Sequence, residues 1–565
     1  MTLNLIKWRF AIIALFTFPK LVFSQFISPV EHNISLTGNF GELRNNHFHE
    51  GFDIRKNHNQ NENKILAVMD GVVSRIKISP DGYGKMLIID HPNGYSTLYG
   101  HLKRYSPELE EFIKSYQYAN HTFEMDVENL NIPIKQGSEV GIMGNTGASR
   151  GEHLHFEILD TKTKTKINPE FFNYDIEDTK PPVFEKLRLV GLDYEFNTMN
   201  SKDFNVYRKN SNTYYISGDT IKMGNVNIGT EVLVYDLMNA NTFHVGIFKL
   251  TLFENQKQKF TITFDSISRA NFYNYKSHID YSQYLINGQK YHRAFALPGD
   301  KMANYDCDRS SPYITLDYDV PKDIELVAED YNGNKSSLKF VVVLDENIDI
   351  PYKPSYNYHV TLGDKCEIDD EDFDIKIDSN AFFKNVYLLA EKIDTNLANV
   401  YSKAVEIYTN KEAFQNSIEV AIKVDKIDEN INNLCIVRID NGQRKILGDN
   451  FEDGFMKVNV SEEGIYVVMA DDTKPVIKPI RYSANMKKYS YMSFKIDDNF
   501  SPNSNCPLKY NGYIDDEWVL FEYDKKNKLI THYFEKTLSA GKHNLKIVVE
   551  DSIGNTKMYN SSFVR

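Results

Sequence analysis

The chain has 565 residues, of which 41% are hydrophobic and 25% charged, and its formal net charge at pH 7 is −13. This length predicts about four domains, and the hydrophobic content is sufficient for several packed cores, which excludes a largely disordered chain. Nucleic acid is bound by clustered lysine and arginine, which a net acidic chain does not favour, so we expect no nucleic-acid partner and expect the acidity to serve solubility.

Residues 1–24 have the pattern of a secretory signal peptide. Lys7 and Arg9 precede a short apolar run, and Val22-Phe23-Ser24 forms a cleavage site. The run is too short to span a membrane, and no cysteine is placed to accept lipid. We therefore expect export to the periplasm or the extracellular space without stable membrane insertion. Loss of three basic residues and no acidic residue would take the formal charge from −13 to −16.

A glycine-rich stretch, residues 141–151, leads into the alternating segment His153-Leu154-His155-Phe156-Glu157-Ile158. Alternation with period two predicts a strand in which His153 and His155 point to the same face. Taken alone, such a pair is more often two partly exposed histidines on a strand. The composition adds weight to it, since nine of the 15 histidines, at positions 32, 47, 49, 58, 91, 101, 121, 153 and 155, lie in the first 155 residues.

Two further segments carry metal-binding residue types. His49 and Asp53 lie four residues apart in an extended segment, which places them on one face, and His101 follows Tyr99-Gly100. A catalytic zinc ion takes three protein ligands and keeps one open position, and His49, Asp53 and His155 supply such a set. Two histidines then remain for proton transfer and for stabilising charge. His47 competes with His49, because both lie on the same side of an extended chain.

Together these segments resemble the lysostaphin and LytM type of zinc metallopeptidase, which cleaves peptide cross-links in bacterial peptidoglycan. Supporting segments are Phe40-Gly41-Glu42-Leu43-Arg44, Gly71-Val72-Val73, Ile134-Lys135-Gln136-Gly137 and Gly144-Asn145-Thr146-Gly147, and the resemblance covers about residues 37–160. It implies a small, mostly antiparallel β-barrel with an open groove. It also implies that His49, Asp53 and His155 bind Zn²⁺, with His153 and His101 beside the catalytic water. His47 then belongs to the scaffold, since only His49 is in register with Gly51 and Asp53.

The resemblance implies an exported zinc metalloendopeptidase that acts on peptidoglycan peptide cross-links. In that reaction His153 accepts a proton from water activated by the metal, and His101 helps to hold the developing charge. One alternative is a non-catalytic LytM-like scaffold that activates another cell-wall hydrolase. A further alternative is a secreted bacteriolytic or matrix protease with the same chemistry. All five positions are filled in this sequence, which favours an enzyme.

Within the expected catalytic domain, residues 25–176, the pattern predicts strands over Lys64–Val68, Gly71–Ile78, Lys85–Asp90 and Tyr95–Leu98. Pro-Asp-Gly and Pro-Asn-Gly sequences between them predict tight turns. The segment 103–133 is an insert in which Ser106-Pro107 predicts the start of a short helix. This insert is either an ordinary surface insertion or a wall of the substrate groove.

Beyond residue 176 the pattern predicts immunoglobulin-like β-sandwich modules over 177–347 and 473–565 around a middle β domain over 348–472. An Asp-containing segment recurs near Asp330 and Asp551, and an Asp-Thr-Lys-Pro segment recurs near Asp178 and Asp472. The fold class is therefore mainly β: a barrel followed by sandwiches. We expect these modules to form a semi-rigid arm that places the barrel at its target and contacts cell-envelope proteins. The alternative is that they bury the barrel's apolar flank and are needed for folding.

The four cysteines, Cys307, Cys366, Cys435 and Cys506, all lie outside the expected catalytic domain. Their wide spacing matches no compact disulfide framework, so free thiols are as consistent with it as disulfides. If one pair forms, Cys366 with Cys435 is favoured, because both lie in the middle domain.

Overall fold

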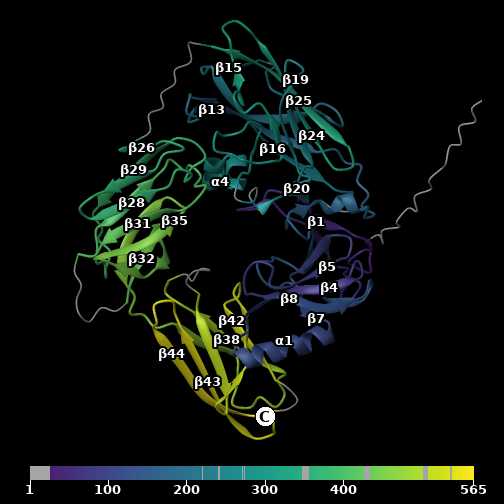
Figure 1. The fold of residues 1–565 in the computed structure, drawn as a ribbon, viewed down its shortest axis with the longest axis vertical. Helices are drawn as coiled ribbons and strands as arrows, with labels where there is room; N and C mark the ends of the chain where they lie inside the picture. Colours follow the sequence, from purple (N-terminus) through teal and green to yellow (C-terminus); the bar gives the residue numbers. More distant parts are fainter. Residues whose placement is uncertain are drawn as a thin grey trace, which may run out of the picture.

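The computed structural model describes residues 26–565 apart from 219, 240–241, 270–271, 273, 346–354, 426–432, 501–506 and 535–537. The expected signal peptide and Cys506 lie outside the described residues. The prediction of a mainly β protein is confirmed: an N-terminal β domain is followed by several antiparallel β-sheet modules. In Figure 1 these parts follow one another around a closed path, so that the yellow C-terminal module lies beside the purple N-terminal domain. No helix among the described residues is long and apolar enough to cross a membrane.

The N-terminal domain is built on a nine-stranded sheet and a three-stranded sheet. The larger sheet contains β1 (Leu36–Gly38), β2 (Phe52–Arg55), β10 (His153–Asp160), β6 (Tyr95–Gly100), β5 (Lys85–Asp90), β4 (Gly71–Ile78), β8 (Met125–Ile134), β11 (Lys166–Ile167) and β20 (Ser266–Ile267). The smaller sheet contains β3 (Lys64–Leu66), β9 (Glu139–Ile142) and β7 (Arg104–Tyr105). The helices are α1 (Pro107–Asn120) and the 3-10 helix η1 (Pro169–Phe172).

Turn chemistry explains why the local predictions succeed in this domain. Strands β4 and β5 have the predicted bounds, because the chain reverses at Gly82 and Gly84, which both adopt positive φ. Helix α1 begins at Pro107 as predicted but runs to Asn120, which makes it longer than the short helix that was predicted. Ser106 precedes it without a side-chain capping bond, so proline at the first turn defines the start.

The second part of the chain contributes a 13-stranded sheet. Its strands are β12 (Val183–Leu192), β13 (Thr198–Arg208), β14 (Thr213–Ile216), β15 (Thr220–Met223), β16 (Asn227–Leu237), β17 (His244–Val245), β18 (Lys249–Glu254), β19 (Lys257–Thr263), β21 (His292–Arg293), β22 (Tyr305–Cys307), β23 (Ile314–Thr315), β24 (Lys322–Glu329) and β25 (Lys335–Leu344). Two short helices follow β20: α3 (Tyr275–His278) and α4 (Tyr281–Asn287). We refer to residues 177–345 as the second module.

The middle domain pairs a six-stranded sheet with a five-stranded sheet over one hydrophobic core. The six strands are β26 (Tyr358–Val360), β29 (Val386–Ile393), β30 (Ala404–Tyr408), β36 (Gly464–Ala470), β32 (Leu434–Asp440) and β33 (Gln443–Gly448). The five are β27 (Cys366–Asp369), β28 (Phe373–Ile377), β31 (Ile418–Lys423), β35 (Phe455–Val460) and β34 (Asn450–Glu452). Cys366 and Cys435 lie in different sheets and are not joined by a disulfide. The favoured disulfide is therefore not formed.

The C-terminal module has two four-stranded sheets that share another core. One contains β37 (Val476–Arg481), β38 (Tyr491–Asp497), β42 (Leu529–Tyr533) and β41 (Glu522–Asp524). The other contains β40 (Glu517–Val519), β39 (Lys509–Ile514), β43 (Lys542–Glu550) and β44 (Thr556–Val564).

The second module shares its core with the N-terminal domain. Phe40 and Phe48 are 1% and 0% exposed, and both belong to the core cluster of the second module. The ring of Phe48 lies 5.5 Å from that of Phe264 and 5.1 Å from that of Tyr275, measured between centroids. Strand β20 also pairs with β11 and so adds a strand of the second module to the nine-stranded sheet. The segment that precedes β2 is therefore packed against the second module.

The C-terminal module also contacts the N-terminal domain. Lys85 pairs with Glu522 at 3.0 Å, and the ring of Trp518 stacks on His121, just beyond helix α1, at 5.3 Å between centroids. The insert thus packs against the C-terminal module. The chain closes on itself, and the modules do not extend away from the N-terminal domain as the expected arm would.

Candidate metal centre

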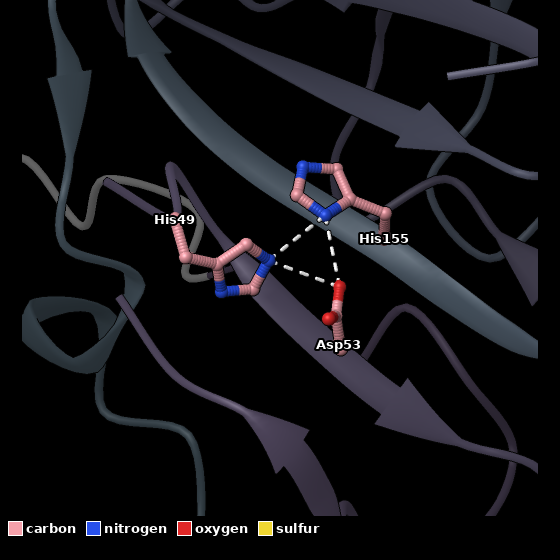
Figure 2. A group of neighbouring side chains, drawn as sticks. All are labelled: His49, Asp53 and His155. Atoms are coloured by element: carbon pink, nitrogen blue, oxygen red, sulfur yellow. Dashed lines mark hydrogen bonds and ion pairs between the residues drawn. The ribbon is translucent and has the colours of Figure 1, made fainter. Parts of the chain in front are cut away.

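His49, Asp53 and His155 converge where β2 and β10 pair. The register of these antiparallel strands places His155 opposite Asp53, so the two side chains project from neighbouring positions on one face. Oδ1 of Asp53 lies 2.9 Å from Nδ1 of His155 and 3.0 Å from Nε2 of His49. The two imidazole nitrogens are 3.1 Å apart. Figure 2 shows the three groups pointing to one position, and all three residues are buried.

Hydrogen bonds outside this cluster fix the orientation of both rings. Nδ1–H of His49 donates to the carbonyl oxygen of Asn39 at 2.7 Å, which leaves the Nε2 lone pair facing Asp53. Nε2–H of His155 donates to Glu157 Oε1 at 2.9 Å, which leaves its Nδ1 lone pair facing the same point. Such outer carbonyl and carboxylate partners are typical of metal-bound histidines.

A second group of contacts holds the carboxylates in place. Arg44 contacts Oδ2 of Asp53 at 2.6 Å, which leaves Oδ1 to face the histidines. Glu157 is fully buried and is paired with Lys166. The hydroxyl of Tyr83 lies 2.6 Å from Glu157 Oε1 and 3.2 Å from Glu50 Oε2. The geometry of the cluster therefore depends on a chain of charged and polar contacts.

The cluster fits a zinc-sized cation by donor type and by spacing. Ligands at about 2.0–2.1 Å from a tetrahedral ion are about 3.3 Å apart, and the three donor atoms here are 2.9 to 3.1 Å apart. A small outward shift of the side chains would suffice to admit the ion. Two nitrogen donors and one carboxylate oxygen are also a common ligand set for catalytic zinc.

The pKa shifts of the cluster also favour binding of a cation. Burial alone would lower the pKa of His155, but its hydrogen bonds to Asp53 and Glu157 outweigh burial and raise that pKa to about 9. Burial would raise the pKa of Asp53, but the neighbouring histidines hold it well below its usual value. The cluster thus attracts positive charge, and a metal ion would replace a proton on His155.

His153 and His101 lie next to the cluster. Nε2 of His153 is 3.3 Å from Asp53 Oδ1, and its Nδ1–H donates to the carbonyl oxygen of Gly151 at 2.9 Å. His101 adopts a left-handed backbone conformation with φ of 62°, and its Nδ1–H donates to the carbonyl oxygen of Thr146 at 2.9 Å. The two rings are 4.8 Å apart between centroids.

These bonds define what each ring can do. A carbonyl oxygen only accepts, so Nδ1 carries the proton in both rings, and Nε2 of each neutral ring is an acceptor. Burial, followed by the charges of His155 and His153, lowers the pKa of His101 to about 3, so this ring is neutral near pH 7. Both rings can therefore accept a hydrogen bond at Nε2. His101 could donate to a developing oxyanion only after protonation.

His47, the competing candidate, lies outside the cluster. Its Nδ1 contacts Oδ1 of Asn46 at 2.6 Å, and its ring stacks on Phe272 at 5.7 Å between centroids. His47 is not part of the group His49, Asp53 and His155, whose ligand atoms lie close enough together to hold one ion.

Several residues of the site carry no role in the sequence-based interpretation. Glu157 could have been found, because it follows His153 and His155 on the same face of β10. Contacts from distant parts of the chain have no local signal. Tyr275 of the second module bonds the backbone carbonyl of Arg44. Lys526 of the C-terminal module bonds the carbonyl oxygens of Asn145 and Ser149 at 2.5 and 3.0 Å.

Comparison with known families agrees with this geometry. Residues 47–118 match the family model described as Peptidase family M23, and residues 357–471 match that of a Zu5-like domain. The chain carries a peptidase family M23 domain. The M23 match contains His49, Asp53 and His101 and ends before β10, so the structure supplies the remaining residues of the cluster.

Similar proteins share this part of the chain. An uncharacterized metalloprotease of Haemophilus influenzae is 30% identical over 93 residues, which are 16% of this chain and 15% of that protein. The DD-carboxypeptidase/endopeptidase Mpg of Neisseria meningitidis serogroup B is 31% identical over 93 residues, 16% of each chain. The catalytic domain of lysostaphin from Staphylococcus simulans is 20% identical over 24% of this chain and 87% of that domain, with a TM-score of 0.18. The match thus spans 15% and 16% of the lengths of these two curated relatives.

Proposed function

We propose that the protein is an exported zinc-dependent endopeptidase that cleaves peptide cross-links of bacterial peptidoglycan. The observation that carries this proposal is the convergence of His49, Asp53 and His155 on one buried point, with His153 and His101 beside it. The M23 domain supplies the reaction class, and the relative described as a DD-carboxypeptidase/endopeptidase supports the substrate class.

His49, Asp53 and His155 would hold the zinc ion. When bound, zinc would act as a Lewis acid on the scissile carbonyl and lower the pKa of water at the site. Arg44 orients Asp53, and Glu157 orients His155, so that the three donors stay directed at one point. These contacts keep the site preorganised.

His153 is the proton acceptor in this proposal. Its Nε2 directs a lone pair at the cluster. The hydrogen bond from its Nδ1–H to the carbonyl oxygen of Gly151 fixes that tautomer. The ring can then pass the proton to the leaving amine, because an imidazole can both accept and donate a proton. His101 presents a second lone pair beside it and helps to orient the attacking water.

The direct test is mass spectrometry of purified peptidoglycan after digestion by the full chain, with and without a chelator. The proposal predicts new free amines in the cross-linking peptides with intact glycan strands, and no products with chelator. His153→Ala should abolish the products, whereas His58→Ala, which changes an exposed histidine of the same domain, should not.

The alternatives predict different products. A non-catalytic scaffold would release nothing by itself and would increase release by another hydrolase, with equal effect from the His153→Ala variant. A protease directed at other proteins would leave peptidoglycan intact and cleave a protein substrate in a chelator-sensitive way. The first result would overturn the proposed enzymatic activity, and the second would overturn the proposed substrate.

A further inference from the structure

Three buried aspartates meet where the N-terminal domain joins the second module. Asp178 lies just before β12, Asp236 near the end of β16, and Asp330 directly after β24. They are 9%, 2% and 4% exposed, and one carboxylate oxygen from each lies within 4.8 Å of the others. Burying three carboxylates together without a cation is costly.

The same arrangement occurs where the middle domain joins the C-terminal module. Asp471, Asp498 and Asp551 also place one oxygen each within 4.8 Å of one another. Asp471 and Asp551 are 1% and 2% exposed. The described part of the chain therefore holds two tri-aspartate clusters, defined as residues 178, 236 and 330 and residues 471, 498 and 551.

Strand pairing shows that the two clusters are structurally equivalent. The residue before Asp236 pairs with the first residue of β12, and the residue before Asp498 pairs with the first residue of β37. Asp330 lies in the turn between β24 and β25, and Asp551 lies in the turn between β43 and β44. Each aspartate therefore has a counterpart at the same place in the other module.

The supporting contacts are duplicated as well. The amide nitrogen of Asn334 donates to Oδ1 of Asp330 at 2.8 Å, and that of Asn555 donates to Oδ1 of Asp551 at 2.9 Å. The side chains of the two asparagines donate to the backbone carbonyls of Asp178 and Asp471, at 3.2 and 2.8 Å. Each cluster is thus built in the same way from three separate segments.

Some carboxylate oxygens in the clusters have no hydrogen-bond donor among the residues that the structure describes. Oδ1 of Asp236, Oδ2 of Asp471 and Oδ2 of Asp551 are buried without a hydrogen bond from any described residue, and so is Oδ1 of the less buried Asp498. Buried polar atoms are normally satisfied, so unsatisfied oxygens that face other carboxylates indicate a missing positive ligand.

The pKa shifts in both clusters are consistent with a missing cation. Burial, followed by the charges of Asp178 and Asp330, raises the pKa of Asp236 to about 9. Burial, followed by the charges of Asp471 and Asp551, raises the pKa of Asp498 to about 6 in the second cluster. Lys180 is a cation near Asp178, and its amine also bonds the carbonyl oxygen of Met238 at 2.8 Å.

We propose that each tri-aspartate cluster binds one divalent cation of the calcium type. Calcium takes oxygen ligands at about 2.3–2.6 Å, so two ligands on opposite sides of the ion are at most about 5 Å apart. The spacing of up to 4.8 Å within each cluster agrees with this limit. Carboxylate oxygens without any nitrogen or sulfur donor distinguish these sites from the zinc-type centre.

The position of each site indicates its role. Each cluster ties the segment that enters a module to two strand ends of that module, so a bound ion crosslinks a junction between domains. Glu170 of η1 lies near the first cluster, and burial with the charges of Asp330 and Asp178 raises its pKa to about 7 despite a bond from Asn168. Calcium would therefore fix the M23 domain relative to the second module.

Equilibrium dialysis of the full chain against about 1 mM CaCl2, after removal of metals from the buffer, tests this directly. We expect two calcium ions per chain, and a rise in melting temperature with CaCl2 that an equal ionic strength of NaCl does not produce. Asp236→Asn and Asp498→Asn should each bind one calcium fewer. Asp394→Asn, which changes an exposed aspartate, should still bind two.

Melting temperatures measured in calcium-free buffer show whether a variant has lost calcium binding because it is misfolded. Replacing one of three clustered carboxylates with an amide removes repulsion, so Asp236→Asn should melt no lower than the parent in calcium-free buffer while losing most of the calcium-dependent shift. Binding of fewer than two calcium ions by the parent, or two by both variants, would overturn the proposal. Zinc content measured on the same samples keeps this outcome separate from that of the proposed peptidase function.

Discussion

Separating the N-terminal domain from the second module should destabilise the metal centre, although the cluster itself lies within residues 25–176. We compare a fragment of residues 25–176 with one of residues 25–345 that keeps the second module. In the shorter fragment Phe40 and Phe48 lose the core that buries them, and β11 loses its partner β20. Tyr275 no longer bonds the carbonyl of Arg44, the residue that orients Asp53.

The size of the effect follows from the burial. Exposing a fully buried phenylalanine costs about 1.5–3 kcal/mol, so two of them cost about 3–6 kcal/mol. A domain of this size is stable by about 5–15 kcal/mol in total, and the loss is therefore a large fraction of its stability. His49 directly follows Phe48, so the disturbance reaches the ligand set.

Urea denaturation followed by circular dichroism, with zinc content measured on the folded protein, distinguishes the outcomes. The fragment 25–176 should unfold at a much lower urea concentration than 25–345 and should retain less zinc. Phe264→Ala in the full chain should lower stability in the same direction, because Phe264 packs on Phe48. Equal midpoints and equal zinc content for the two fragments would refute this reasoning. The modules would then serve only to place the N-terminal domain at its target.

Three further predictions concern single side chains. His155→Ala should lose most of the zinc, whereas His153→Ala should keep zinc and lose turnover, because a proton acceptor is not a ligand; elemental analysis beside kcat on a soluble cross-linked peptide decides this, and unchanged zinc in the first variant would contradict it. Lys526→Ala frees the loop that holds His101 and should reduce kcat by roughly tenfold or less with zinc retained, while Lys525→Ala, which removes the ion pair with Asp81, should act like the parent. Burial lowers the pKa of His292 to about 3, so the unfolded state binds the extra proton below about pH 6.5 and the free energy of unfolding should fall by up to about 1.4 kcal/mol per pH unit on acidification; His292→Gln should reduce that slope in urea titrations, and an unchanged slope would exclude this histidine as its source.

Local sequence patterns predicted the parts of the fold that local chemistry determines. Strands β4 and β5 were predictable, because glycine turns fix both ends of the hairpin. The alternating histidines of β10 were predictable from period two, and the structure places them beside His49 and Asp53. The recurring Asp330 and Asp551 segments were visible as repeats, but Asp236 and Asp498 come from other strands and had no signal of their own.

Long-range packing explains what the sequence could not show. Phe48 looks like any apolar residue beside a histidine, and only the fold reveals that its core belongs to the second module. Lys526 reaches Asn145 from the far end of the chain, at a sequence separation of 381 residues. No pattern within one segment reports such contacts, since they arise when the last module closes against the first domain.

The most direct test of the central claim is a zinc titration of the metal-free full chain, with cleavage of a purified cross-linked muropeptide dimer as the measurement. The account predicts that the rate rises linearly to one zinc equivalent per chain and then levels off, with two muropeptide monomers as products. His155→Ala should remain inactive throughout the titration. Cleavage by the chelated chain, or an intact dimer at one equivalent of bound zinc, would contradict the account.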